Sequence, residues 1–165
     1  MHLVPPDPAA VARAFNEAGA DFILIGGFAV IAHSVLRTTE DSDLLIPDDE
    51  TNDRAIFDAL LALGAVGMNG EEVTVERITQ RSSFRMMTPG AGTVDLIRGG
   101  LPPLDWESVL ERSINGTVHG AEMRIAGLES LVAFKRLAGR PRDLADLSDL
   151  EAVHGPLPAS NLDLD

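Results

Sequence analysis

The chain has 165 residues, of which 45% are hydrophobic and 24% are charged, so it is long enough for one domain with a hydrophobic core. This composition excludes wholesale disorder, and the lack of cysteine excludes disulfides and thiolate metal sites. The formal net charge of −13 opposes non-specific binding to nucleic acid, whose phosphates carry the same sign.

The sequence predicts a single domain over residues 1–155, with a helical C-terminal part at about 127–153 and a flexible tail at 156–165. The N-terminal residues lack the basic and apolar regions of a secretory signal, and no run of about 18 apolar residues occurs. We therefore expect a cytoplasmic protein that does not enter a membrane.

The first part of the chain predicts alternating helices and strands. A proline-led segment that ends near Gly19 has the apolar spacing of an amphipathic helix. The apolar run at 22–25 has no polar alternation, which is typical of a strand covered on both faces. Gly26 and Gly27 then predict a sharp turn, and the apolar segment 28–36 predicts a short buried helix.

The rest of the chain continues this alternation. An apolar stripe predicts a helix from about Asp49 to Gly64. Alternating or short apolar runs bounded by turns predict strands at 41–46, 73–78, 83–87, 93–97 and 121–125. Further helices are predicted at 104–114, from 127 and from 141. The predicted fold class is therefore α/β (α+β), a mixed sheet flanked by helices with a C-terminal helical segment.

Two aspartates stand at the beginning of the predicted strand at 41–46. Because side chains alternate along a strand, Asp41 and Asp43 point to the same face. Two carboxylates that close repel each other unless a cation lies between them, and hard oxygen ligands favour Mg²⁺ or Mn²⁺. The preceding Gly26 and Gly27 would offer backbone N–H groups to a phosphate at the start of a helix.

Asp95 is a lone acid inside the predicted strand at 93–97. A buried carboxylate needs a partner or must take up a proton. One alternative is an ion pair with Arg85 or Arg98, and the other is a third carboxylate ligand of the metal site.

Charged residues also interrupt the apolar faces of the two C-terminal helices. Lys135 shares a helical face with Leu131 and Val132. Its stem could extend outward to water, or its ammonium needs an anion such as a nucleotide phosphate. Asp143 and Asp146 share a face with leucines in the next helix, which solvation alone does not explain.

The glycine pair and the three aspartates resemble the signature of nucleotidyltransferases of the polymerase-β-like superfamily. In that family the glycine turn holds the nucleoside triphosphate, and the aspartates hold two metal ions. The resemblance implies that Gly26 and Gly27 bind nucleotide and that Asp41, Asp43 and Asp95 are catalytic residues that bind Mg²⁺ or Mn²⁺.

Further positions are similar to those of minimal bacterial members of this superfamily, relatives of the AbiEii toxins and the MNT-type proteins. The matching residues are His33, Arg37, Thr39, Lys135, Asp143 and Asp146. The resemblance implies that Lys135 adds positive charge at the nucleotide and that Asp143 and Asp146 support the site. Arg37 would either brace the strand that carries the aspartates or contact a phosphate.

The implied activity is transfer of a nucleoside monophosphate from a nucleoside triphosphate to a hydroxyl of an unidentified acceptor, which is RNA, protein or a small molecule. A role in a toxin-antitoxin pair is part of this expectation. Three alternatives stay open: a catalytically silent antitoxin or adaptor with a cognate partner protein, an aminoglycoside-type adenylyltransferase, and an acidic domain with buried ion pairs. Three converging acids count against the silent relative, because a chain without a metal gains nothing from them.

Overall fold

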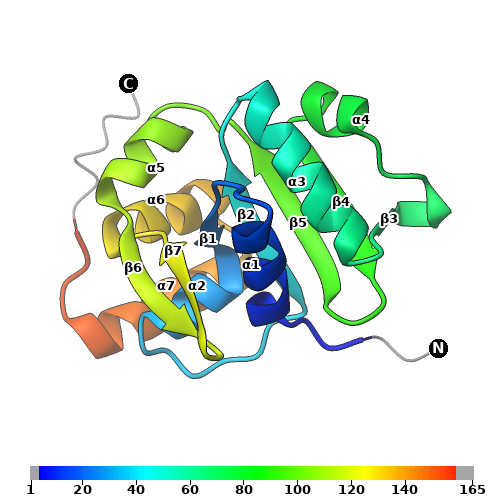
Figure 1. Cartoon of the computed structure of the whole chain (residues 1–165). Coiled ribbons are helices and arrows are strands. Elements are labelled where there is room, and N and C mark those ends of the chain that lie inside the picture. The colour runs from blue at the N-terminus through cyan, green and yellow to red at the C-terminus, as the bar shows by residue number, and fades with distance from the viewer. Residues whose placement is uncertain (1–3, 159–165) are drawn as a thin grey trace.

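A mixed sheet of seven strands runs through the computed structural model, which describes residues 4–158 (Figure 1). The strand order is β3-β4-β5-β2-β1-β7-β6. The β1–β7 and β2–β5 pairs are parallel, and the other pairs are antiparallel. The strands are β1 (Ile23–Ile25), β2 (Asp41–Ile46), β3 (Val66–Gly67), β4 (Ser83–Thr88), β5 (Gly92–Arg98), β6 (Ile114–Val118) and β7 (Ala121–Ile125).

Helices cover both faces of this sheet, which confirms the predicted fold class (Figure 1). Residues of α1 and α3 belong to the larger apolar cluster, residues of α5 belong to the smaller cluster on the opposite face, and α6 contributes residues to both. The helices are α1 (Pro8–Glu17), α2 (Gly26–Ala32), α3 (Glu50–Ala62), the 3-10 turn η1 (Met68–Gly70), α4 (Val75–Gln80), α5 (Trp106–Arg112), α6 (Leu128–Ala138) and α7 (Pro141–His154).

The alternation of side chains along β2 decides which face carries the acids. Leu44 and Ile46 join the larger cluster, whereas Leu45 joins the smaller one. Asp41, Asp43 and Leu45 are every second residue of β2, and side chains alternate along a strand, so the two aspartates lie on the same face of the sheet as Leu45. The acidic end of β2 therefore opens towards the side that α5 and α6 cover.

The prediction of a strand at 73–78 is wrong, because residues 75–78 belong to α4, which continues to Gln80. The hydroxyl of Thr74 accepts a hydrogen bond from the backbone N–H of Arg77 at 3.2 Å and caps the helix. Ile78 is buried. The alternating pattern of so short a segment fits a strand and a single helical face equally well, and the side-chain cap favours the helix.

Two other predicted helices differ from the structure at their ends. The helix predicted at 28–36 begins at Gly26 and ends at Ala32, because Ser34 adopts a positive φ of 74° and turns the chain. The helix predicted at 104–114 spans only Trp106–Arg112. It is followed by β6, an edge strand that the sequence analysis did not predict.

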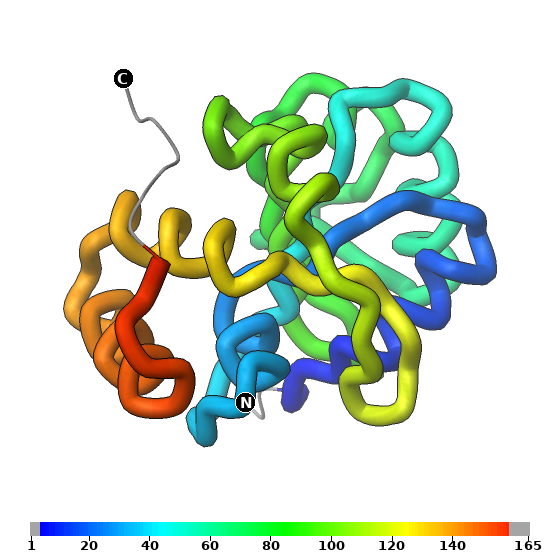
Figure 2. The backbone as a smooth tube through the Cα atoms, turned by 90° about the vertical axis from the view of Figure 1, so that its left-hand side faces the viewer, coloured from blue at the N-terminus to red at the C-terminus, as the bar shows by residue number. Residues whose placement is uncertain are grey.

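The C-terminal helices α6 and α7 pack against each other beside α2 (Figure 2). This arrangement places the chain's last helices against the turn that follows β1. The predicted tail at 156–165 lies largely outside the described residues. Within residues 4–158, no helix is long and apolar enough to cross a membrane.

Candidate active site

Three aspartates meet on one face of the sheet, where β2 lies between β1 and β5. The parallel register pairs Asp43 with Asp95, and Asp41 points to the same face from two residues earlier. One carboxylate oxygen from each residue lies within 4.8 Å of the other two. Three hard oxygen donors at this spacing fit a divalent cation such as Mg²⁺ or Mn²⁺.

The surroundings of Asp43 disfavour its ionised form. Burial, and after it the neighbouring Asp95 and Asp41 carboxylates, together raise its pKa from 3.8 to about 7. Lys135 acts in the opposite direction but does not offset these effects. Because the ionised form of Asp43 is disfavoured beside two other acids, a divalent cation bound there would stabilise that form strongly.

The glycine pair is required by its contacts with the aspartate strand. Because β1 and β2 are antiparallel, the end of β1 lies beside the beginning of β2, and Ile25 pairs with Asp43. A Cβ atom on Gly26 would overlap Oδ2 of Asp43. A Cβ atom on Gly27 would lie 2.6 Å from Oγ1 of Thr39. The turn is therefore packed directly against the acidic cluster.

Arg85 neutralises part of the cluster from the next strand. Its Nε donates to Oδ1 of Asp95 at 2.9 Å, and its Nη2 donates to Oδ2 of the same carboxylate at 2.9 Å. The same Nη2 donates to Oδ2 of Asp41 at 2.6 Å. The hydrogen bonds to Asp95, and after them the negative charges of Asp95 and Asp41, raise the pKa of the Arg85 guanidinium above its usual range. The ion-pair alternative for Asp95 is therefore confirmed, with Arg85 as the partner. Its role as a third metal ligand stays a prediction, which its place in the acidic cluster allows.

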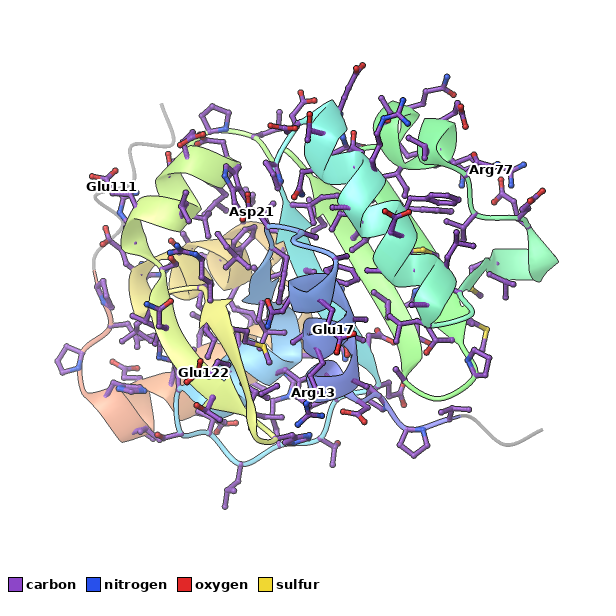
Figure 3. The ribbon with its side chains drawn as sticks, viewed as in Figure 1. Arg13, Glu17, Asp21, Arg77, Glu111 and Glu122 are labelled. Atoms are coloured by element: carbon purple, nitrogen blue, oxygen red, sulfur yellow. The ribbon has the colours of Figure 1, made fainter. Side chains whose placement is uncertain are left out.

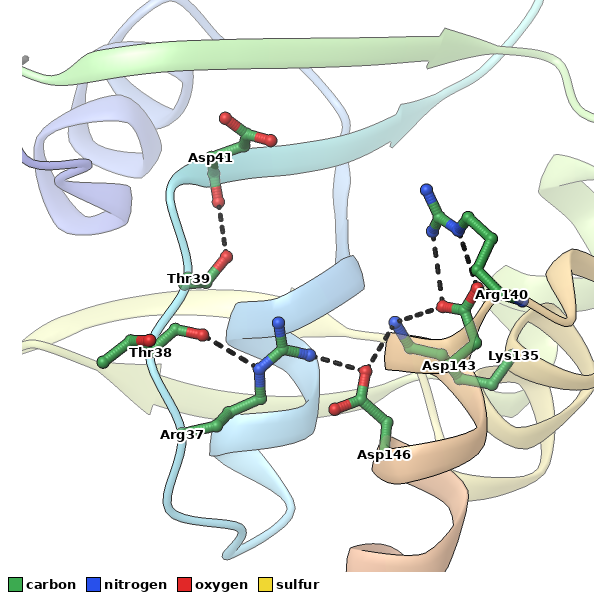
Figure 4. Close-up of polar contacts among 8 residues, drawn as sticks. All are labelled: Arg37, Thr38, Thr39, Asp41, Lys135, Arg140, Asp143 and Asp146. Atoms are coloured by element: carbon green, nitrogen blue, oxygen red, sulfur yellow. Dashed lines mark hydrogen bonds and ion pairs between the residues drawn. The ribbon is translucent and has the colours of Figure 1, made fainter.

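A chain of alternating charges lies along the C-terminal side of the site (Figure 4). Lys135 is buried, and its Nζ lies 3.2 Å from Oδ1 of Asp143 and 3.0 Å from Oδ2 of Asp146. Arg140 continues the chain through Asp143 at 2.7 Å, and Arg37 continues it through Asp146 at 2.5 Å. The network ties the segment after α2 to both C-terminal helices.

This network supplies the anion that Lys135 needs, and it explains the two acids on α7. Burial would raise the pKa of Asp143, but hydrogen bonds from Arg140 and Lys135 lower it to about 2. Arg37 braces α7 through Asp146 and hydrogen-bonds the Thr38 carbonyl oxygen through its Nε. Within residues 4–158, Arg37 makes no hydrogen bond to β2, the strand that one of its two alternatives expected it to brace.

The acidic cluster and the network share one pocket of about 600 Å³. Its charged lining residues are Arg37, Asp41, Asp43, Arg85, Asp95, Lys135, Arg140, Arg142 and Asp143. Five of the chain's 13 basic residues thus gather at one site of an acidic protein. The surplus acids are spread elsewhere: Glu17, Glu111 and Glu122 are exposed side chains of α1, α5 and β7 (Figure 3).

The structure brings most of the predicted site residues to this pocket. Gly26, Gly27, Arg37, Thr39, Asp41, Asp43, Asp95, Lys135 and Asp143 line it. Asp146 is not among the lining residues, but it forms ion pairs with Lys135 and Arg37. His33 is not among the lining residues, and its Nε2 lies 2.8 Å from the carbonyl oxygen of Ala126.

Three arginines of the pocket were not predicted as site residues. Arg85 entered the sequence analysis only as an ion-pair partner of Asp95, and Arg140 and Arg142 did not enter it as site residues. The available signal was the alternation along β4, which places Arg85 opposite the buried Phe84 and Met86. Arg140 and Arg142 flank the proline that starts α7, and a helix N-terminus is a place where an anion can bind.

No family model and no curated protein matches this chain, whereas solved structures do. The lincomycin-bound lincosamide antibiotic adenylyltransferase LnuA aligns with a TM-score of 0.65 and 14% identity, over 92% of this chain and 99% of that chain. ANT(2'')-Ia in complex with adenylyl-2''-tobramycin aligns with a TM-score of 0.61 and 15% identity, over 88% and 86%. An antigenic nucleotidyltransferase-like protein from Paracoccidioides brasiliensis gives 0.55 and 18%, over 92% and 78%.

These likenesses establish the nucleotidyltransferase fold for this chain. The narrower resemblance to the AbiEii toxins and the role in a toxin-antitoxin pair stay predictions.

Proposed function

We propose that this chain is a metal-dependent nucleotidyltransferase, which moves a nucleoside monophosphate from a nucleoside triphosphate to a hydroxyl group of an acceptor. The observation that carries the proposal is the convergence of Asp41, Asp43 and Asp95 beside the Gly26–Gly27 turn in one pocket. The fold and the adenylyltransferases among its structural neighbours support it.

Asp41, Asp43 and Asp95 would hold two Mg²⁺ or Mn²⁺ ions. When bound, these ions would lower the pKa of the acceptor hydroxyl and neutralise charge on the triphosphate. Of the three residues, Asp95 would accept the proton of the attacking hydroxyl. The new bond joins the hydroxyl oxygen to the α-phosphorus, and the bond to pyrophosphate breaks.

The triphosphate would lie against the glycine turn and the basic wall of the pocket. Gly26 and Gly27 carry no side chain that would hold the phosphates away from the backbone. Arg140, whose side chain is 60% exposed, and the exposed Arg142 line the same pocket. Lys135 is paired with two carboxylates, so it would act on the phosphates mainly through its long-range positive charge and through the position of Arg140.

The acceptor would not be a polycation, because the pocket has no surplus of acids to attract one. Five basic residues face four acids there, and three of those acids would be neutralised by the metal ions. An aminoglycoside-type substrate is therefore the less favoured alternative. A neutral or anionic acceptor that carries a free hydroxyl fits the charge of the lining residues better.

The test is transfer of label from α-³²P-labelled nucleoside triphosphates, with Mg²⁺, to a panel of RNA, protein, aminoglycoside and lincosamide acceptors. We expect Mg²⁺-dependent labelling of one acceptor class with pyrophosphate release, and loss of both in Asp43→Asn. The exposed Asp58 gives the matched control Asp58→Asn, which keeps the wild-type rate. Labelling that persists in Asp43→Asn would contradict the proposed site.

A further inference from the structure

Arg85 is bonded to two of the three carboxylates that would hold a metal ion. Its guanidinium takes both carboxylate oxygens of Asp95 and the Oδ2 oxygen of Asp41. The antiparallel register places Arg85 directly opposite Asp95, which in turn is directly opposite Asp43. A single row across β4, β5 and β2 therefore carries one cation followed by two acids on the same face.

We infer that Arg85 is the built-in counter-cation of the three aspartates and that it competes with divalent ions for them. This inference rests on the metal site of the proposed function. Each of the three hydrogen bonds directs a donor at one of the carboxylates whose oxygens fit a metal ion. A guanidinium and a divalent cation repel each other and prefer the same oxygens. Binding of the ions at Asp41 and Asp95 thus requires Arg85 to move away.

The surroundings of Arg85 allow this movement. Its side chain is 47% exposed, and it extends from β4, the strand next to the β3 edge of the sheet. By contrast, the side chain of Arg98 is 12% exposed and its Nη2 lies 2.7 Å from the fully buried carboxylate of Asp53. Arg98 is therefore both paired and buried, whereas nearly half of the paired Arg85 side chain is in contact with solvent.

The displaced guanidinium would find its next partner in the same pocket. Arg85 lines the pocket together with Arg140 and Arg142, so a phosphate bound there would lie within reach of its long side chain. A planar guanidinium suits phosphate as well as carboxylate. Metal would then free Arg85 for the nucleotide, and the nucleotide would hold Arg85 away from the metal, so each ligand raises the affinity of the other.

The direct test is a titration of metal-free protein with Mn²⁺, in which electron paramagnetic resonance measures the concentration of unbound Mn²⁺. Arg85→Met removes the competing charge and keeps an apolar stem. We expect it to bind Mn²⁺ at least roughly tenfold more tightly than the wild type, since it removes charge-assisted hydrogen bonds to the ligands. Arg85→Lys keeps the charge but loses the two-pronged geometry, and it should show a smaller increase.

The matched control is Arg81→Met. Arg81 also makes two hydrogen bonds to one carboxylate, that of Glu71, and neither residue lines the pocket. Its Mn²⁺ affinity should equal that of the wild type. Unchanged or weaker Mn²⁺ binding by Arg85→Met, with a native circular dichroism spectrum, would overturn the inference. If Arg85→Met does not fold, Arg85→Lys decides the question in the same way.

A second titration separates this inference from the proposed function. Adding a non-hydrolysable nucleoside triphosphate analogue should tighten Mn²⁺ binding in the wild type, and should tighten it less in Arg85→Met. If no analogue binds but Arg85→Met still gains Mn²⁺ affinity, the competition stands and the proposed transfer reaction falls. If analogues bind with Mn²⁺ but Arg85→Met gains no affinity, the transfer reaction stands and the competition falls.

Discussion

Gly26 and Asp43 lie so close together that a Cβ atom on residue 26 would overlap the Oδ2 oxygen of Asp43. Gly26 also has a positive φ of 69°, which costs other residues about 1–2 kcal/mol. We therefore expect Gly26→Ala to lower the free energy of unfolding and to abolish Mn²⁺ binding, because the carboxylate must move. Urea unfolding and the Mn²⁺ titration measure the two effects.

Gly19 provides the matched control for this substitution. It has a similar φ of 72°, but a Cβ atom there would meet nothing within 4 Å. Gly19→Ala should lower stability through the backbone alone and leave Mn²⁺ affinity unchanged. Equal Mn²⁺ affinities in Gly26→Ala and the wild type would show that the glycine does not position Asp43.

The raised pKa of Asp43 predicts a pH dependence of metal-free stability. Burial first, and then the Asp95 and Asp41 charges, raise this pKa from 3.8 to about 7. The folded state therefore binds the proton more tightly than the unfolded state, and the stabilisation is present below about pH 4 and is lost as the pH rises through 7. Asp43→Asn should remove this slope and raise the free energy of unfolding at pH 8 by roughly 1–2 kcal/mol.

Urea unfolding in a chelating buffer at pH 5.5, 6.5 and 8 tests this prediction, with Asp58→Asn as the control. A metal ion must also displace the proton, so Mg²⁺ affinity of the wild type should fall as the pH drops below 7. A variant Asp43→Asn that is less stable than the wild type at pH 8 would mean that the ionised carboxylate is well stabilised without metal.

We expect Lys135 to contribute more to the stability of the fold than to nucleotide binding. Its side chain is 8% exposed and lies between Asp143 and Asp146. Removal of one partner from a buried ion pair typically costs about 3–5 kcal/mol, although Arg140 and Arg37 would still partner the two acids. We expect Lys135→Met to lower the free energy of unfolding by about 2–3 kcal/mol, as measured by urea titration.

The neighbouring Arg136 offers a control on the same helix, because it is exposed and does not line the pocket. Arg136→Met should change the free energy of unfolding by less than about 0.5 kcal/mol. If Lys135→Met were as stable as Arg136→Met and lost only nucleotide affinity, the phosphate contact implied by the resemblance would be its main role.

The lowered pKa of Asp143 predicts that its contribution to the stability of the protein is lost at acidic pH. Burial raises the pKa of Asp143, but the hydrogen bonds from Arg140 and Lys135 lower it by more, so that the pKa is about 2. The stabilisation is therefore present above about pH 4 and is lost as the pH falls towards 2. The difference in unfolding free energy between wild type and Asp143→Asn should be largest near neutral pH and should shrink by pH 3. A difference that stays constant would contradict this pKa.

The acidic strand was predictable from sequence because its signal is local. The strand predicted at 41–46 is β2, and the alternation that placed Asp41 and Asp43 on one face holds in the structure. The strand predicted at 93–97 lies within β5. Their mutual register, which brings Asp95 opposite Asp43, depends on pairing between distant segments, and only the resemblance suggested it.

Other features were missed because their cause is tertiary. Strand β6 pairs with β7 at the sheet edge and exposes Ile114 and Asn115, so it lacks the apolar alternation of a strand with a buried face. Lys135 on an apolar face was visible as an anomaly, but its carboxylate partners lie on the next helix. A single sequence does not tell whether a buried lysine meets a ligand or the protein's own acids.

The most direct test of the central claim is the thermal unfolding of the protein with Mg²⁺ and each of the four ribonucleoside triphosphates. At about a hundred times its Kd a ligand adds roughly 2.7 kcal/mol of stability, so binding at the pocket is readily seen. We predict a Mg²⁺-dependent rise in Tm with at least one triphosphate, which is absent in Asp43→Asn and retained in Asp58→Asn. Unchanged Tm with all four triphosphates would contradict a nucleotidyltransferase site and favour a catalytically silent protein of the same fold.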